Sequence, residues 1–300
     1  MNWAGTAILC AATQGTVSIL DSHLASKRIP SFRSFLLLVS VMQLSAGLLF
    51  YYLFPLPERV GILPVLAGLA SGVLRAASIG IMFYSLRKKE VTQVIPIIHT
   101  NPIFVAVLAI PLLGETLSSW HWLAIAIVVV GAVMVSMEKN PAGVTRLPIG
   151  TFVLLIISSL LYAMANLTAK YALNDISFWN SYSLGALGIA FVFLIISLRP
   201  RVIDEIVGMA QRGSSLALFV FKEAIVIVGM LLLLWSIEMG PVSLVSTIVG
   251  SRPIFVVIYS MILGWIFPNF LIKSANRQLV MLRLLATVMI FGGIAIIYLS

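Results

Sequence analysis

Stretches of apolar residues divide this chain into segments that are each long enough to cross a membrane as a helix. A helix rises about 1.5 Å per residue, so the roughly 30 Å of hydrocarbon in a bilayer needs about 20 apolar residues. The chain is 61% hydrophobic and only 10% charged, whereas about 25% of the residues in a soluble domain are charged. We therefore predict an all-α, polytopic membrane bundle of ten transmembrane helices. The ten predicted spans are Trp3–Asp21, Phe32–Phe54, Leu63–Leu86, Val91–Leu113, Trp120–Met137, Ile149–Tyr171, Phe178–Leu198, Ser215–Ile237, Val242–Ile266 and Leu279–Tyr298.

One segment of the chain occurs twice, at a spacing of half the chain length. Residues 91–104 read VTQVIPIIHTNPIF and residues 242–255 read VSLVSTIVGSRPIF, so that Pro102 corresponds to Pro253. We predict two five-helix repeats, residues 1–147 and residues 148–300, which together form one transmembrane domain. Because five is odd, the second repeat enters the membrane in the opposite direction, and the repeats are inverted. Inverted repeats are typical of secondary transporters, whose substrate site lies between the halves.

The basic residues gather at one side of the predicted bundle. Of the 19 lysines and arginines, 14 lie in or beside the odd-numbered connections between spans, and the even-numbered connections hold only Arg59. By the positive-inside rule the odd connections are cytoplasmic, so both termini are predicted to be non-cytoplasmic. The net charge of +9 is thus explained by topology. A nucleic-acid partner is not favoured, because the basic residues are scattered over short turns.

The fourth and fifth spans carry a family resemblance. Asn101–Glu115 reads NPIFVAVLAIPLLGE, and the next span contains WLAIAIVVVGAVMVS. With ten spans arranged as five plus five, the chain resembles the EamA-type branch of the drug/metabolite transporter superfamily over nearly its whole length. The resemblance implies transport of a small molecule across a membrane. Family members are commonly drawn with cytoplasmic termini; we follow the loop charges instead.

The glutamate of this motif has no counterpart in the second repeat, which reads Leu-Gly-Trp at residues 263–265. A role shared by both repeats is therefore not implied for Glu115. We interpret Glu115 as a helix cap or as a contact to interfacial water, rather than as a proton carrier.

Ionisable residues inside the spans are the candidates for function, because a charge at the bilayer centre costs roughly 2.5–3.5 kcal/mol unless it has a partner or lines a cavity. Arg75 shares a helical face with small residues, which leave room for close helix approach or around a guanidinium. Three interpretations of Arg75 stay open: a structural ion pair with Glu223, direct substrate contact, or a gating pair. Glu223, the only carboxylate well inside a span, is a coupling or gating candidate. The four residues of this kind are Arg75, Lys222, Glu223 and Arg252.

The repeated proline marks the second candidate region. Pro102 and Pro253 are predicted helix kinks, because proline removes a backbone donor. Arg252 corresponds to Asn101, so we expect a polarised site with Arg252 on one wall. Arg252 would contact substrate or a counter-ion, pair internally, or snorkel towards the membrane interface. The opposite wall would hold His99, Thr100 and Asn101, where His99 either bonds between helices or couples protons.

Enzyme motifs are missing from the sequence, which contains no HExxH, GxSxG or Walker loop, and its three histidines lack metal-ligand spacing. We predict no enzyme activity, no metal and no cofactor.

The predicted function is secondary transport of a small metabolite across the cell membrane by alternating access. The excess of basic groups favours an anionic substrate. An exporter of amino acids or amphiphilic compounds, or a lipid-linked carrier flippase, is the alternative. The expected partners are a small-molecule substrate and the lipid bilayer, and a homodimer is left open.

Overall fold

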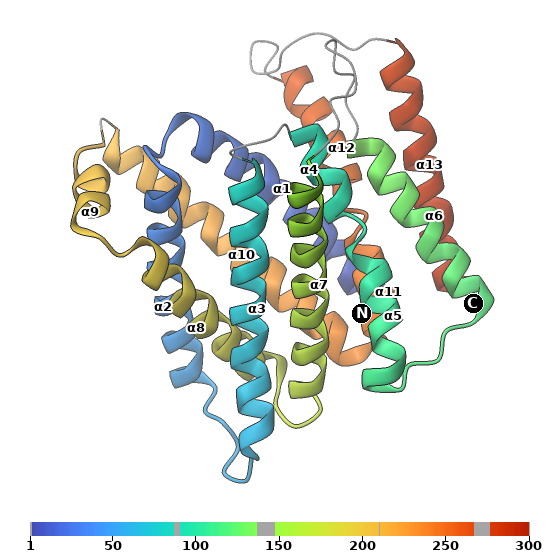
Figure 1. Ribbon diagram of the computed structural model, residues 1–300, viewed down its shortest axis with the longest axis horizontal. Coiled ribbons are helices and arrows are strands. Elements are labelled where there is room, and N and C mark those ends of the chain that lie inside the picture. The colour runs from blue at the N-terminus through green and yellow to red at the C-terminus, as the bar shows by residue number, and fades with distance from the viewer. Residues whose placement is uncertain (1, 87–90, 137–147, 210, 267–276, 300) are drawn as a thin grey trace.

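The computed structural model describes residues 2–86, 91–136, 148–209, 211–266 and 277–299, and in these ranges the chain is helical without strands (Figure 1). Side-chain caps open several of the helices. Asn2 Oδ1 accepts a hydrogen bond from Gly5 N at the start of α1, and Ser31 and Ser177 do the same for α2 and α8. The helices are α1 (Trp3–Lys27), α2 (Phe32–Leu53), α3 (Ile62–Leu86), α4 (Val91–Ile98), α5 (Asn101–Leu113), α6 (Ser119–Ser136), α7 (Ile149–Ala172), α8 (Phe178–Ser197), α9 (Pro200–Val207), α10 (Arg212–Met239), α11 (Val242–Val249), α12 (Arg252–Ile266) and α13 (Arg277–Leu299).

The predicted all-α membrane bundle is confirmed. Among the described residues, nine helical stretches are long and apolar enough to cross a membrane, and α13 adds a shorter apolar stretch, Leu284–Leu299. Large apolar side chains are exposed on the outer faces, such as Phe191 at 63% and Val288 at 68%. Apolar surface of this kind is stable against lipid and unfavourable in water.

The fourth and ninth predicted spans are broken, not merely kinked. One helix ends at Ile98 and the next begins at Asn101, and the second copy breaks at the corresponding positions, Val249 and Arg252. Each proline lies at the second position of the new half-helix, where its missing N–H leaves no bond unmade. Short-range bonds cross each gap, from Thr100 N to Ile97 O and from Ser251 N to Ile248 O. The expected kinks at Pro102 and Pro253 are therefore interruptions of the helix.

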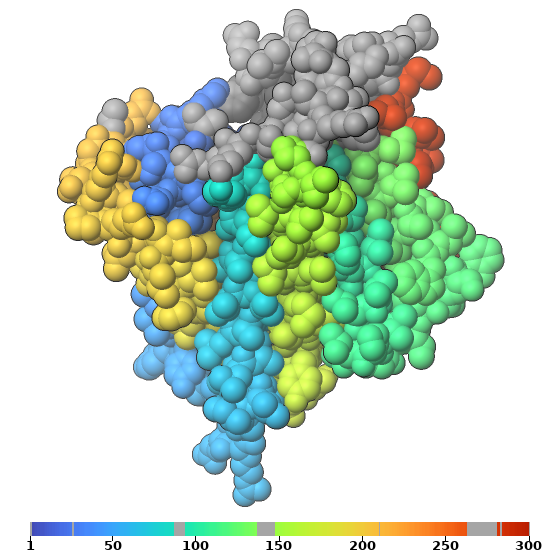
Figure 2. Space-filling model, viewed as in Figure 1, coloured from blue at the N-terminus to red at the C-terminus, as the bar shows by residue number. Residues whose placement is uncertain are grey.

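The long helices pack mainly against helices of the other half of the chain. α3 lies along α7, as Figure 2 shows on one face of the molecule, and α1 lies along α10. α2 pairs with α8, and α6 pairs with α13. Glycines bring the last pair together, because a Cβ on Gly131 of α6 would lie 2.6 Å from Ile290 Cγ1 of α13.

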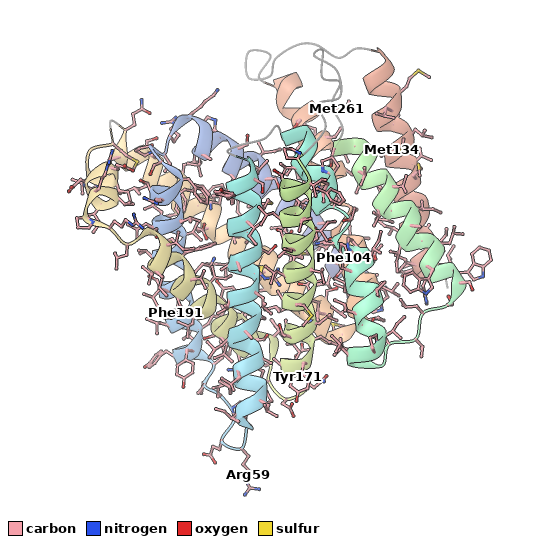
Figure 3. The ribbon with its side chains drawn as sticks, viewed as in Figure 1. Arg59, Phe104, Met134, Tyr171, Phe191 and Met261 are labelled. Carbon is pink, nitrogen blue, oxygen red and sulfur yellow. The ribbon has the colours of Figure 1, made fainter. Side chains whose placement is uncertain are left out.

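The short amphipathic helix α9 was not predicted. It lies between α8 and α10, at the same end of the bundle as the turn between α1 and α2 (Figure 1). Its Glu205 Oε2 accepts hydrogen bonds from the hydroxyls of Ser31 at 2.5 Å and Ser34 at 2.8 Å, at the start of α2. These bonds hold the pKa of the Glu205 carboxyl below its usual value. Arg59, in the only even-numbered connection with a basic residue, projects from the opposite end (Figure 3).

Candidate functional site

A small cavity, with room for about one water molecule, lies between α2, α3, α8 and α10. Its apolar wall includes Met230 and Leu234 of α10. One hydroxyl, Ser181 Oγ, is buried without a hydrogen-bond partner among the described residues. A buried polar group that lacks a partner costs about 1–3 kcal/mol, so it marks a place where a ligand or water group is accommodated. The polar lining residues are Gln43, Ser71, Arg75, Ser181 and Tyr182.

Arg75 of α3 is the charged residue of this cavity, and its side chain is only 4% exposed. Its Nη2 donates a hydrogen bond to Asn166 Oδ1 of α7 at 2.9 Å, and its Cζ lies 4.9 Å from the centroid of the Tyr162 ring. Both partners are neutral. Among the described residues, no carboxylate forms an ion pair with Arg75, so the ion pair between Arg75 and Glu223 that the sequence suggested is wrong.

The small residues that share the face of Arg75 do allow close helix approach. Ser78 Oγ donates a hydrogen bond to Ser158 O of α7 at 2.7 Å. On the α8 side, a Cβ on Gly68 would lie 2.9 Å from Leu184 Cδ1, and one on Gly72 would overlap the carbonyl oxygen of Gly185. Arg75 is therefore held on a helix that is fixed on two sides.

Glu223 and Lys222 belong to a separate buried group, which we call the charge cluster: Asp21 of α1 with Lys222 and Glu223 of α10. Lys222 Nζ lies 2.5 Å from Glu223 Oε1 and 3.1 Å from Asp21 Oδ1. The ammonium also lies over the rings of Phe219 and Phe35, 4.3 and 4.8 Å from their centroids, where cation–π attraction adds to the ion pairs.

A chain of hydrogen bonds connects the charge cluster with the cavity. Gln43 Nε2 donates to Glu223 Oε2 at 3.2 Å, and the Tyr182 hydroxyl donates to Gln43 Oε1 at 3.4 Å. Both Gln43 and Tyr182 line the cavity.

The residues at the helix breaks do not line this cavity. Thr100 Oγ1 donates to Ile97 O in its own turn, at 2.6 Å. Arg252 Nη1 donates to Gln14 Oε1 of α1 at 3.4 Å. His99 is buried and Asn101 is partly buried. The polarised site expected from Arg252, His99, Thr100 and Asn101 is thus not brought together around the cavity.

Glu115 caps a helix, as interpreted from the sequence, and the helix is α11 in the other half of the chain. Its carboxylate accepts hydrogen bonds from Val242 N at 2.5 Å and from Ser243 N at 3.3 Å. Lys170 Nζ holds the preceding carbonyls, donating to Ile237 O at 2.6 Å and to Gly240 O at 3.0 Å. The negative Glu115 therefore binds the start of α11, and the positive Lys170 binds the end of α10. This is the placement of charges that the helix dipole favours.

Sequence reasoning missed the neutral partners of the charged residues. Asn166 and Gln43 are amides inside apolar spans. Because a buried amide needs hydrogen-bond partners, the sequence could have identified both residues as candidate partners of the buried charges. Asp21 was placed at a span end, where its pairing with a buried lysine was not evident. Within the part of the chain that the structure describes, no group of three His, Cys, Asp or Glu residues could hold a metal ion.

Comparison with known proteins supports the family resemblance. Residues 1–137 match the model of the EamA-like transporter family. A sequence comparison with curated proteins finds no match. A crystal structure of another protein has the same fold, with a TM-score of 0.72 over 99% of this chain and 95% of that chain; the 17% sequence identity limits this likeness to the fold. Residues 1–137 are therefore similar to the EamA-like transporter family, which belongs to the drug/metabolite transporter superfamily.

Proposed function

We propose that this membrane transporter moves a small organic anion across the cell membrane by alternating access, with Arg75 as the group that binds the anion. The substrate carries a carboxylate or a phosphate, whose oxygens match the planar fork of a guanidinium. The two halves of the chain act as inverted repeats around the cavity, and the basic connections face the cytoplasm.

The observation that carries this proposal is the uncompensated positive charge of Arg75. Arg75 is 4% exposed, and the partners of its guanidinium, Asn166 and Tyr162, are neutral. Burying an unpaired charge costs several kcal/mol, and an anion in the cavity would supply the missing charge.

The neighbouring groups suit an anionic ligand with hydroxyl or carbonyl groups. Ser181 Oγ has no hydrogen-bond partner among the described residues, and the hydroxyl of Tyr182 lines the same cavity. A hydroxyl can donate to a ligand oxygen or accept from a ligand hydroxyl. Asn166 also donates to Ser246 Oγ of α11 at 3.2 Å, so an anion that pulls on Arg75 would act on the second half of the chain through Asn166.

A thermal-shift screen of the purified protein tests the substrate class. The panel contains carboxylates and phosphate monoesters, each paired with a neutral analogue of similar size. A ligand that binds the folded state raises the apparent Tm, by mass action. We expect at least one anion to stabilise the protein while its neutral analogue does not.

The matched control removes the positive charge of a second arginine. Arg75→Gln should abolish the stabilisation by the anion, whereas Arg252→Gln removes the same charge away from the cavity and should retain it. Stabilisation by neutral or cationic ligands alone would contradict an anionic substrate. Equal loss in the two variants would contradict the role of Arg75.

A further inference from the structure

We propose that the charge cluster of Asp21, Lys222 and Glu223 binds one exchangeable proton, and that Gln43 and Tyr182 link this proton to the anion at Arg75. One proton then crosses the membrane with each monovalent anion, in the same direction. The proton site stands on its own, whereas its link to the anion rests on the proposed function.

The charge cluster contains two carboxylates and one ammonium. Lys222 and Glu223 are 2% and 1% exposed, and the ammonium contacts both carboxylates, at 2.5 and 3.1 Å. With all three groups ionised, the cluster carries one uncompensated negative charge, which is costly to bury. A proton on one carboxyl makes the cluster neutral, as when two carboxylates share a site.

The neighbouring helices contribute few other charges. α1 also carries Cys10, with His23 and Lys27 near its end; α2 carries Arg33 at its start and the neutral Gln43, and α8 supplies the Tyr182 hydroxyl. Arg252 of α12 carries a positive charge, and its Nη1 donates a hydrogen bond to Gln14 of α1. α11 has no ionisable residue, and Lys170 of α7 is engaged with the carbonyls at the end of α10. The proton is therefore assigned to the two carboxyl groups of the cluster.

The two carboxylates differ in access. The side chain of Asp21 is 29% exposed, whereas that of Glu223 is 1% exposed. Lys222 lies between them and can pass a proton on: the ammonium gives one proton to the Glu223 carboxylate and receives one from the Asp21 carboxyl. The sum converts protonated Asp21 and ionised Glu223 into ionised Asp21 and protonated Glu223.

The link to the anion is electrostatic and runs through hydrogen bonds. Gln43 bonds Glu223 on one side and Tyr182 on the other, and both line the cavity that holds Arg75. An anion in the cavity adds negative charge near Glu223 and favours its protonated form. By reciprocity, the proton favours the anion to the same extent.

Infrared difference spectra of the purified protein, recorded against pH without any substrate, test the proton site. The wild type should show one carboxyl of the charge cluster that gains a proton as pH falls. Asp21→Asn and Glu223→Gln should each abolish this step, because the remaining carboxylate pairs with Lys222. Lys222→Gln should move the step to higher pH. Glu58→Gln, in an exposed connection, is the control and should leave it unchanged.

The same spectra, recorded for variants that change the charge in the cavity, test the link between the proton and the anion. Arg75→Gln removes a positive charge and should raise the midpoint by roughly one pH unit, a tenfold gain in proton affinity. Arg75→Glu mimics a bound anion and should raise it further. Absence of the step in the wild type, or its survival in both carboxyl variants, overturns the proton site. A midpoint that Arg75 variants do not move overturns the link. If the spectra behave as expected while no anion stabilises the protein, only the proposed substrate class fails.

Discussion

Gly72 of α3 and Gly185 of α8 bring their two backbones into contact, since a Cβ on Gly72 would overlap the carbonyl oxygen of Gly185. Under the predicted repeat, α3 and α8 correspond to α10 and α2. That second pair meets at only a few residues, including Phe35 and Phe219, whose ring centroids are 5.6 Å apart. Gly72 and Gly185 both line the cavity, so the wall between α3 and α8 is closed by glycine packing.

A large side chain at Gly72 should open the closed side. We expect Gly72→Leu to expose the cavity, because a leucine side chain cannot fit against the Gly185 backbone unless α3 and α8 move apart. The measurement is the rate at which a membrane-impermeant maleimide labels Ser181→Cys in a Cys10→Ala background. Labelling should be faster with Gly72→Leu than in the parent.

The control lies on the same helix. A Cβ on Gly80 meets no atom within 4 Å, so Gly80→Leu should label at the parent rate. Equal rates for all three proteins would show that the glycine contact does not close the cavity.

The turn between α10 and α11 should contribute measurable stability through Glu115. Glu115→Ala leaves Val242 N and Ser243 N without their acceptor, and we expect the free energy of unfolding to fall by about 1–3 kcal/mol. Glu115→Gln should cost less, because its amide oxygen can still accept. Thermal unfolding in detergent measures both, with Glu58→Ala as the exposed control. A Tm for Glu115→Ala that equals that of the control would refute the capping role.

Acid should release α9 from the start of α2. The hydrogen bonds from Ser31 and Ser34 lower the pKa of Glu205, so their stabilisation is present above the usual carboxyl value and is lost as pH falls through the lowered pKa. A spin label at Val207 should become mobile as pH falls below that value. Ser34→Ala should shift the transition to higher pH, and Glu205→Gln should make the label mobile at every pH. Mobility that does not change with pH would exclude Glu205 as the anchor.

Hydropathy was enough to locate the membrane helices. In lipid each span must make its backbone hydrogen bonds internally, so a long apolar stretch has to be a helix. The repeated proline segment also located both interruptions, at Asn101 and Arg252. The sequence did not show that the helix stops there, since proline permits either a kink or a new start. Helix α9 was missed because a helix of only eight residues is too short to be told from a connection between two spans.

The partners of the charged residues were harder to predict. Arg75 and Glu223 were recognised as buried charges, but their contacts with Asn166 and Gln43 depend on which helices are neighbours. The suggested ion pair of Arg75 with Glu223 implied that α3 and α10 meet. The structure instead places α3 against α7 and α8, and α10 against α1.

Transport of the stabilising anion into liposomes tests the role of Arg75 most directly. The measurement is counterflow of the labelled anion identified by thermal shift, in proteoliposomes with equal amounts of folded protein. Arg75→Lys should transport more slowly, because an ammonium lacks the planar fork, and Arg75→Gln should fall to the level of empty liposomes while Arg252→Gln keeps clear activity. Counterflow by Arg75→Gln at the wild-type rate would contradict anion binding at Arg75.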